Sequence, residues 1–316
     1  MRVAIVGYGR LGKAAELLLR DREDIELVGI FSRHAEPSTE TLIYPQSDLF
    51  DFDNIDCALL CLGSSADMLE LAPKIAMRFN TADTFDNHKR IREYYQIMNV
   101  NANNSCHSAV ISSGWDPGLL SVMRSYCYSF LQKPHVHTVW GRGVSQGHSE
   151  VLRRIPGVRR AVAITIPDPS SVSALMQGRI TATETELHTR LCVIVADECD
   201  RKAIEDNIRS FPDYFAPYRC EVRFVSEEVF ARDYSNLTAH RGQVIASGVS
   251  GVYGENFTRF HAELASDSNP QLTAGILLSA AIAACRLNKE KRYGAFTTLD
   301  VPPSYFLYGR NYFEFV

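Results

Sequence analysis

Apolar runs alternate with amphipathic stretches along the first third of the chain. The apolar runs occupy residues 2–7, 25–32, 56–63, about 82–86 and 108–114. The stretches with helical periodicity cover about 11–20, 68–78 and 88–103. Strands that are apolar on both faces are typical of a parallel sheet covered by helices. This pattern predicts an α/β fold whose first lobe is a Rossmann-like parallel sheet.

The pattern changes after Pro117. Strand-like segments now follow one another with only one clear helix, about 201–211, among them. These segments are 135–141, 161–167, 189–196, 220–226 and 243–247. They predict a mixed α+β lobe, mainly antiparallel, suited to substrate binding and subunit pairing.

A last apolar stretch, about 272–285, is too short to span a bilayer and predicts a buried helix. We expect this helix to return the chain to the first lobe. The predicted domains are therefore residues 1–117 with about 269–316 for dinucleotide binding, and about 118–268 for substrate binding and dimerisation.

Composition narrows the functional classes. The chain of 316 residues is 46% hydrophobic and 22% charged with a net charge of −4, which gives no general affinity for nucleic acid or membranes. The basic run 153–160 is then a solvated loop or the edge of a site. Eight cysteines are scattered without metal-ligand spacing, which predicts buried thiols in a reduced, cytoplasmic protein and no metal site. The N-terminus runs directly into a strand and not into a signal peptide.

The stretch "GYGRLG" has the spacing of a dinucleotide fingerprint. Gly7 permits a tight turn, Gly9 lets the backbone approach a pyrophosphate, and Gly12 permits close packing of helix on strand. The N–H groups of the following helix would face the phosphates. The loop residues proposed to contact the cofactor are Gly7, Tyr8, Gly9, Arg10, Leu11 and Gly12. The alternative is a glycine turn that is purely structural.

The end of the second strand indicates which dinucleotide binds. An NAD site usually has a carboxylate about 20 residues beyond the motif, whereas this chain has Ser32 and Arg33 there. A hydroxyl and a guanidinium can bind a 2′-phosphate that a carboxylate would repel. The sequence therefore predicts NADP(H), and the alternative is that Arg33 is an ordinary surface arginine.

Three further stretches follow predicted strands, where ligands bind to parallel sheets. The loop "CLGSS" brings Gly63, Ser64 and Ser65 to the expected nicotinamide half of the cofactor. Asp86 ends "DTFD", and Trp115 and Asp116 follow in "SSGWDPG". Asp86 is alternatively a helix N-cap, but the cations of "HKRIR" would then fall in the first helical turn, where the dipole disfavours them.

These stretches resemble the meso-diaminopimelate D-dehydrogenase family. The resemblance extends over essentially the whole chain and includes "RVAIVGYGRLG", "DTFDNHKRI", "SSGWDPGLLSV", "WGRGVSQGHSEVLRRIPGV", "FPDYF", "SNPQLTA" and "GAFTTLDV". It implies an NADP-dependent homodimer that reversibly deaminates the D-centre of meso-diaminopimelate to L-2-amino-6-oxopimelate, which cyclises to tetrahydrodipicolinate, and ammonia. The implied setting is lysine and cell-wall precursor metabolism, and the small-molecule substrate would be the only partner besides the second subunit.

The resemblance also implies roles for individual residues. At the reacting centre, Asp86 and Asp116 would hold the amine and orient the α-hydrogen. Trp115 and Trp140 would form flat walls, and the backbone at Gln146, Gly147 and His148 would meet the reacting carboxylate. Core packing is the alternative for the two tryptophans.

At the distal L-centre, the resemblance assigns Thr165, Arg190, His240 and Asn269. Arg190 would bind the distal carboxylate bidentately, and its alternative is a salt bridge at a sheet edge. His240 is alternatively a structural histidine. Two departures from the family lie nearby: Arg241 stands where a small residue is expected, and 247–260 is about three residues longer than usual, which predicts an altered loop beside the distal pocket.

Two other functions remain open. One is an NADP-dependent D-amino acid dehydrogenase of broader specificity, which the altered loop would favour. The other is a sensor that binds NADP without turnover. The sequence shows neither a lost carboxylate nor an added interaction tail that would favour it.

Overall fold

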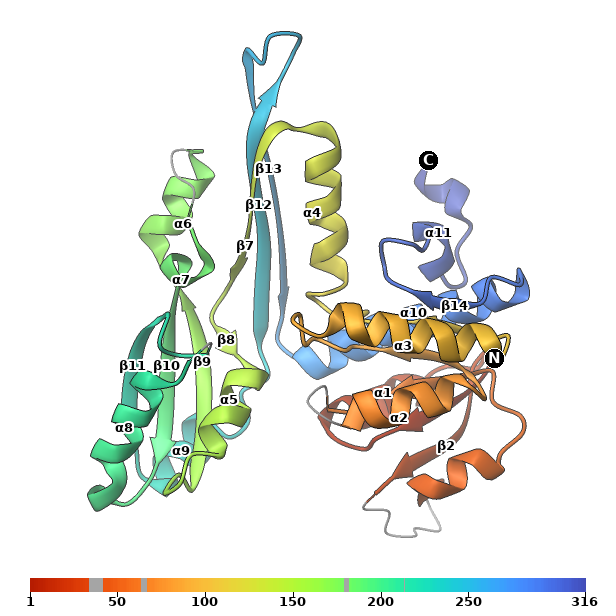
Figure 1. The fold of residues 1–316 in the computed structure, drawn as a ribbon, viewed down its shortest axis with the longest axis horizontal. Helices are drawn as coiled ribbons and strands as arrows, with labels where there is room; N and C mark the ends of the chain where they lie inside the picture. Colours follow the sequence, from red (N-terminus) through yellow and green to blue (C-terminus); the bar gives the residue numbers. More distant parts are fainter. Residues whose placement is uncertain (34–41, 64–66, 179–181, 213) are drawn as a thin grey trace. The chain divides into compact units, whose positions relative to one another are not determined.

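The computed structural model describes residues 1–33, 42–63, 67–178, 182–212 and 214–316. The chain divides into two compact units, drawn in Figure 1. Unit 1 comprises residues 1–122 and 270–316, and unit 2 comprises residues 123–269. The division falls inside helix α4 (Leu119–Phe130). Ser64 and Ser65, two of the predicted cofactor residues, lie outside the described residues.

Unit 1 is built on a seven-stranded sheet in which every strand pair is parallel. The strand order is β14-β6-β5-β4-β1-β2-β3. The strands are β1 (Arg2–Val6), β2 (Glu26–Ser32), β3 (Ile43–Pro45), β4 (Cys57–Leu60), β5 (Asn80–Asp83), β6 (Ser108–Val110) and β14 (Gly294–Phe296). The predicted Rossmann-like sheet is confirmed, and the sequence pattern missed only the three-residue strands β3 and β14.

Helices cover both faces of this sheet because its strands are apolar on both sides. Val3 and Ile5 of β1 pack against α1 (Arg10–Arg20) and α10 (Asn269–Lys289). Ala4 and Val6 point the other way, to the cluster formed with α2 (Asp67–Ala76) and α3 (Ile91–Asn104). A short 3-10 helix, η1 (Gln46–Asp51), closes the β3 edge.

Helix α10 is long and apolar enough to cross a membrane by composition alone, yet 56% of its most apolar window is buried inside the protein. Its alanines and leucines pack against β1 and β4 in the core of unit 1. We conclude that α10 is a core helix, as the sequence predicted.

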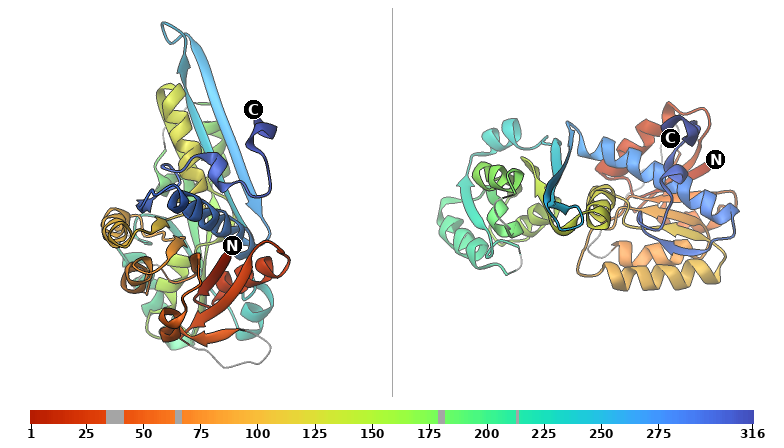
Figure 2. Two further views of the ribbon diagram at one scale, coloured as in Figure 1. Left: turned by 90° about the vertical axis from the view of Figure 1, so that its right-hand side faces the viewer. Right: turned by 90° about the horizontal axis from the view of Figure 1, so that it is seen from above.

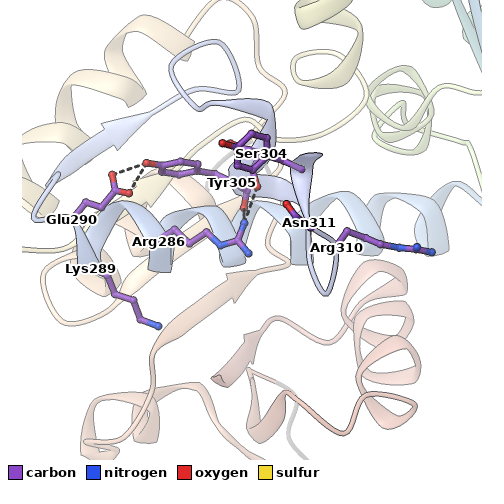
Figure 3. Close-up of a pocket in the computed structure, with 8 residues that line it drawn as sticks. Arg286, Lys289, Glu290, Ser304, Tyr305, Arg310 and Asn311 are labelled. Atoms are coloured by element: carbon purple, nitrogen blue, oxygen red, sulfur yellow. Dashed lines mark hydrogen bonds between the residues drawn. The ribbon is translucent and has the colours of Figure 1, made fainter. Parts of the chain in front are cut away.

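The C-terminal segment folds back over the end of α10 (Figure 3). The Arg286 guanidinium donates to the carbonyl oxygens of Ser304 and Tyr305 at 2.8 and 3.0 Å, and the Tyr305 hydroxyl donates to Glu290. These bonds anchor α11 (Pro303–Phe306) to α10. Together with the start of the final 3-10 helix η3 (Tyr312–Phe315), these elements line a hollow of about 470 Å³.

Unit 2 contains two sheets. The four-stranded sheet has the order β11-β10-β9-β8, and the three-stranded sheet has the order β13-β12-β7. The strands are β7 (Gln132–Trp140), β8 (Gly143–Val144), β9 (Arg160–Pro167), β10 (His188–Val195), β11 (Arg219–Phe224), β12 (His240–Ser250) and β13 (Asn256–Ser266). All strand pairs are antiparallel except β10–β11, so the mainly antiparallel lobe is confirmed.

Helices pack on both sheets of unit 2, and the sequence pattern found only one of them. In the four-stranded sheet, one face packs with α5 and α8, and the other packs with α9. In the three-stranded sheet, β12 contacts α6 and β7 contacts α7. The helices are α5 (Gln146–Arg153), α6 (Pro169–Met176), α7 (Glu184–Leu187), α8 (Arg201–Ser210), preceded by η2 (Glu198–Asp200), and α9 (Glu227–Asp233). Four of these span eight residues or fewer, which is too short to show helical periodicity.

The long hairpin β12–β13, which is most visible in the left view of Figure 2, corrects one prediction. Residues 247–260 do not form a loop beside the distal pocket. They are the ends of β12 and β13 with the turn between Ser250 and Asn256, and the register pairs Ser250 with Asn256. His240 pairs with Ser266 at the opposite end of the hairpin, ten residues along β12 or roughly 33 Å away at strand spacing.

Candidate functional site

The glycine loop after β1 has the geometry of a dinucleotide cradle. Gly7 has a φ of +97°, and a Cβ on it would lie 2.5 Å from the Cys61 carbonyl oxygen. A Cβ on Gly12 would lie 2.1 Å from the Gly7 carbonyl oxygen, so both glycines are required by close packing. Gly9 is different, since its Cβ would meet nothing within 4 Å. Open space at the N-terminal end of α1 is what an approaching pyrophosphate needs.

The other residues of this loop have separate environments. The Tyr8 hydroxyl donates to the buried carboxylate of Glu16, and Lys13 lies over the Tyr8 ring at 5.5 Å. Arg10 begins α1 and is exposed, and Leu11 packs at the edge of the α1 cluster. The loop residues thus leave the helix N-terminus open while the Tyr8 side chain is anchored to α1.

Ser32 and Arg33 follow the sheet edge as predicted. Ser32 is the last residue of β2 and Arg33 is exposed just beyond it. The Arg33 guanidinium is nevertheless engaged, because its two terminal nitrogens donate to the two carboxylate oxygens of Asp67 at 3.1 and 2.7 Å. Asp67 is the first residue of α2, shortly after Gly63. No local sequence pattern predicts this pair, since 34 positions separate its members.

Asp86 lies on the segment between β5 and α3. The Asp86 side chain is exposed, and α3 begins only at Ile91 with Arg90 at the N-cap position. The N-cap alternative for Asp86 is therefore wrong. The dipole argument is largely overturned too, because His88, Lys89 and Arg90 precede the helix and only Arg92 lies in its first turn. Arg90 pairs with Glu93 at 2.8 Å. Asp86 remains a candidate by position alone.

Asp83, which the sequence reasoning did not single out, organises the segments that carry both candidate acids. Its buried carboxylate accepts from the backbone N–H groups of Phe85 and Ser112 at 3.0 and 2.8 Å and from the Tyr94 hydroxyl at 2.6 Å. Burial raises the pKa of Asp83, and these hydrogen bonds oppose that rise. One carboxylate therefore joins the segment after β5 to the segment after β6.

The stretch "SSGWDPG" forms a closed turn after β6. The Gly114 N–H donates to the Pro117 carbonyl at 3.0 Å, and a Cβ on Gly118 would lie 2.2 Å from the Gly114 carbonyl oxygen. Trp115 is only 6% exposed, whereas Asp116 is half-buried and accepts from the Ser121 hydroxyl at 3.3 Å. The turn thus separates a packed indole from a more accessible carboxylate.

In unit 2, several candidates share one row across the four-stranded sheet. The register pairs Gly143 with Thr165 and Thr165 with Arg190. Arg190 is 3% exposed, donates to the Thr165 hydroxyl and lies 4.2 Å from the centroid of the Tyr218 ring. A buried guanidinium held by a hydroxyl and an aromatic face is suited to a carboxylate ligand. Tyr218 was missed because its contact comes from a turn before β11.

The predicted segment 146–148 is the first turn of α5. Helical N–H groups at this position have no partner within the helix, and the space beside Gly147 is open for 4 Å. The His148 Nε2 atom lies 2.9 Å from the Tyr214 carbonyl oxygen and must carry the proton, so Nδ1 accepts from the Ser145 hydroxyl at 2.8 Å. Burial, together with the Arg190 charge, lowers the pKa of His148 to about 3.

His240 and Trp140 meet beside this row. Their rings lie 5.1 Å apart, and a Cβ on Gly143 would lie 2.9 Å from the His240 Nδ1 atom. Burial lowers the pKa of His240 to about 4, so the ring is neutral near pH 7. The fully buried His188, which the sequence reasoning missed, accepts from the Trp140 backbone N–H at 2.9 Å and holds that strand end.

Asn269 and Arg241 complete the base of the hairpin. The Asn269 N–H donates to the Thr238 carbonyl at 2.8 Å, which places it at the His240 end of β12. Arg241 is exposed, and its Cβ would be 2.5 Å from a Cβ on Gly141. The larger residue is accommodated because a glycine faces it.

The structure therefore brings Thr165, Arg190, His148, Trp140 and His240 together in unit 2, and Asp86, Trp115 and Asp116 onto two joined segments of unit 1. Among the described residues, no group of three His, Cys, Asp or Glu side chains has the geometry of a metal site.

Comparisons of the sequence and of the fold with known proteins lead to the same family. Residues 114–266 match the model of the diaminopimelic acid dehydrogenase C-terminal domain. The meso-diaminopimelate D-dehydrogenase of Corynebacterium glutamicum is 42% identical over 305 residues, covering 96% of this chain and 94% of that protein.

Two solved structures extend the comparison. The C. glutamicum DAP dehydrogenase in complex with DAP has a TM-score of 0.94 at 40% identity and covers 99% of this chain and 97% of that one. An engineered D-amino acid dehydrogenase bound to NADP+ has a TM-score of 0.90 at 38% identity, covering 99% and 98%.

Proposed function

The chain belongs to the meso-diaminopimelate D-dehydrogenase family, and from that premise we propose that it oxidises the D-centre of meso-2,6-diaminopimelate with NADP+. The products are L-2-amino-6-oxopimelate, ammonia and NADPH, and the reaction is reversible. The observation that carries this proposal is Arg190, a buried cation on a sheet row with Thr165 and beside His148. A substrate with a second carboxylate at a distance from the reacting centre offers a group that this guanidinium can bind.

The residues of unit 1 fit NADP. The open space at Gly9 and the N-terminus of α1 suit the pyrophosphate, and Arg33 beyond β2 suits the 2′-phosphate. When bound, the nicotinamide supplies a hydride acceptor. The NADP+-bound relative at 38% identity supports this choice.

At the reacting centre, we assign Asp86 and Asp116 to the amine. Two carboxylates can accept hydrogen bonds from the substrate nitrogen and so direct the hydrogen on the D-carbon. Asp83 keeps both segments in place through its bonds to Phe85 and Ser112. Trp115 is nearly buried, so little of its ring is open to form the wall that the resemblance implies.

The chemical step requires a proton to leave the substrate nitrogen and a hydride to leave the D-carbon, which gives an imine. Water then adds to the imine carbon and ammonia leaves, so the carbonyl oxygen of the product comes from water. The hydride takes with it the electron pair of the broken C–H bond. A carboxylate at Asp86 or Asp116, or a water bound to one of them, accepts the proton from nitrogen.

At the distal centre, Arg190 and Thr165 bind the carboxylate, and neutral His240 and Asn269 offer hydrogen bonds. The first turn of α5 offers N–H groups to the carboxylate at the reacting centre. Holding both ends of the substrate explains stereochemistry, because only the D-centre then presents its hydrogen for transfer.

A D-amino acid dehydrogenase of broader specificity is the second candidate, since a structural relative carries that name. Arg190 argues against it, because a simple D-amino acid has no second carboxylate to form hydrogen bonds with this 3% exposed guanidinium. The hairpin turn no longer argues for it, since the extra residues lie far from His240.

We also propose a cytoplasmic homodimer. Eight free thiols, two of them exposed, suit a reducing compartment. The edge strand β13 and the exposed aromatic residues Tyr126 and Phe130 of α4 offer a surface for a second copy.

The function is tested by following NADPH absorbance with NADP+ and the meso, L,L and D,D isomers of diaminopimelate, with D-alanine and NAD+ as controls. We expect turnover only for the meso isomer with NADP+. Comparable rates with D-alanine would support the broader enzyme, and NADP+ binding without any turnover would support a sensor.

A further inference from the structure

The arginine assigned to the 2′-phosphate already holds an anion of the chain itself. Both terminal nitrogens of Arg33 donate to both carboxylate oxygens of Asp67, at 3.1 and 2.7 Å. This is the fork-to-fork arrangement by which arginine also binds phosphate. The same edge of the guanidinium cannot serve both anions at once.

The position of the pair connects it to the cofactor site. Arg33 follows the end of β2, and Asp67 opens α2 after the loop that leaves β4. These two strands flank β1, whose own end carries the glycine loop. The adenosine half of a dinucleotide lies against this edge of a Rossmann sheet, so the pair stands where the 2′-phosphate must arrive.

The pair is accessible enough to be exchanged. The Arg33 and Asp67 side chains are 60% and 36% exposed, and exposed ion pairs are weak. A 2′-phosphate carries more charge than one carboxylate and three acceptor oxygens, so it can displace Asp67 from Arg33.

We propose that Asp67 is a specificity-determining residue that competes with the 2′-phosphate of NADP(H) for Arg33; this rests on the proposed NADP dependence. Dinucleotides with a 2′-phosphate release Arg33 from Asp67, and those without it leave the pair intact. Apparent affinity for NADP+ is then reduced by the fraction of molecules whose Arg33 is paired.

The size of the effect follows from the strength of an exposed pair. Freeing Arg33 should tighten NADP+ binding by roughly twofold to fivefold, since exposed pairs contribute little. Affinity for NAD+ should stay the same, because NAD+ has no group that needs Arg33. Asp67 also lies in the first turn of α2, where acids stabilise the helix, so its loss has a separate structural effect that must be controlled.

The experiment measures binding of NADP+ and NAD+ to the full-length protein by isothermal titration calorimetry, without substrate. The variants are Asp67→Asn, Arg33→Ala and the double variant. Glu70→Gln is the matched control, because Glu70 lies in the same first turn and pairs with Lys74 at 3.5 Å. Circular dichroism melting compares the folding of all variants.

We expect Asp67→Asn to tighten NADP+ alone, Glu70→Gln to change neither ligand, and Asp67→Asn to have no effect once Arg33 is alanine. Weaker NADP+ binding in Asp67→Asn would overturn the proposal and make Asp67 a support for Arg33. An equal gain in the Arg33→Ala background would also overturn it, since the charge would then act on phosphate directly. If the wild-type protein binds NAD+ as tightly as NADP+, the NADP assignment itself fails, and the competition fails with it.

Discussion

Single side chains at the distal centre act through their neighbours. Tyr218 is not among the residues that the sequence assigns to the substrate. Its ring centroid nevertheless lies 4.2 Å from the Arg190 guanidinium carbon and 5.9 Å from the centroid of the His148 ring. An aromatic face over a buried guanidinium restricts the plane in which its N–H groups point. Tyr218 is therefore a positioning residue for Arg190.

We predict that Tyr218→Leu raises KM for meso-diaminopimelate by about 3-fold to 30-fold, the range of a partly desolvated cation–π contact. Tyr218→Phe keeps the ring and should remain close to wild type. Steady-state kinetics distinguish this role from general destabilisation, because kcat and the KM for NADP+ should not change. A KM as high in Tyr218→Phe as in Tyr218→Leu would contradict a role for the ring face.

His148 links the site to acid stability. Its folded pKa of about 3 lies below the ordinary value of 6.5, so below pH 6.5 the unfolded chain binds a proton that the folded protein does not. The free energy of unfolding therefore falls on acidification from about pH 6.5 toward pH 3, by at most about 1.4 kcal/mol per pH unit for this one group.

Urea unfolding between pH 7 and pH 5 measures this loss. We predict that His148→Asn makes the loss smaller, whereas His135→Asn, at an exposed histidine, leaves it as in wild type. His240, with a folded pKa of about 4, contributes with the same sign and remains in both variants. An unchanged pH slope in His148→Asn would show that this ring accepts a proton in the folded protein.

At the scale of elements, the ends of β5 and β6 depend on one carboxylate. Asp83→Ala would strand the N–H groups of Phe85 and Ser112 and the hydroxyl of Tyr94, at a cost of about 1–3 kcal/mol for each group that finds no water. We predict a lower melting temperature and a kcat that falls with it, since Asp86 and Asp116 lie on the segments that Asp83 joins.

Asp83→Asn is the matched variant for this prediction. Its amide oxygen can still accept from the two N–H groups, and its NH2 group can donate to the Tyr94 hydroxyl. It should keep most of the activity that Asp83→Ala loses. Full activity in Asp83→Ala would show that the two segments hold their positions without this carboxylate.

The sequence predicted β1, β2, β4 and β6 well because each lies in a continuous apolar run. It was less accurate for β5 (Asn80–Asp83), which is polar at three of its four positions and begins before the predicted segment 82–86. It failed for α5, α6, α7 and α9, since a helix of eight residues or fewer has too few turns to show a period. It also placed 247–260 in a loop, because Gly248, Gly251 and Gly254 interrupt a pattern that strand pairing then overrides.

The candidate site residues also divide into those that a local pattern or the family resemblance predicts and those that neither predicts. Gly7, Gly12 and Arg33 follow from local spacing, and a family resemblance supplied Thr165 and Arg190. Some residues instead act through partners far away in the chain or on a neighbouring strand, and no local pattern predicts such contacts. These residues are Asp67, Asp83, His188 and Tyr218.

At the scale of the whole molecule, the chain crosses from unit 1 to unit 2 within α4 and returns through α10. Unit 2 is therefore one continuous stretch of the chain, whereas unit 1 is formed by two separate segments. The exposed aromatic side chains near the first crossing concern assembly, because Tyr126 and Phe130 are 54% and 51% exposed on the same face of α4. Phe130 also meets Phe260 of β13 at 6.5 Å, which joins this face to the edge strand.

A surface that combines exposed aromatic rings with an eleven-residue edge strand is expected to be covered, since both features otherwise promote association. A second copy of the chain provides the same surface and the same edge, which suits a two-fold contact.

We predict that the wild-type protein has twice the mass of the 35.4 kDa chain by light scattering. Tyr126→Asp combined with Phe130→Asp should give single chains, because two charges would be buried without partners. Val100→Asp, at a position 56% exposed on α3, is the control and should leave the mass unchanged. A double variant that keeps the mass of two chains would place the contact elsewhere, whereas a wild-type protein of single mass would show that α4 and β13 remain open to solvent.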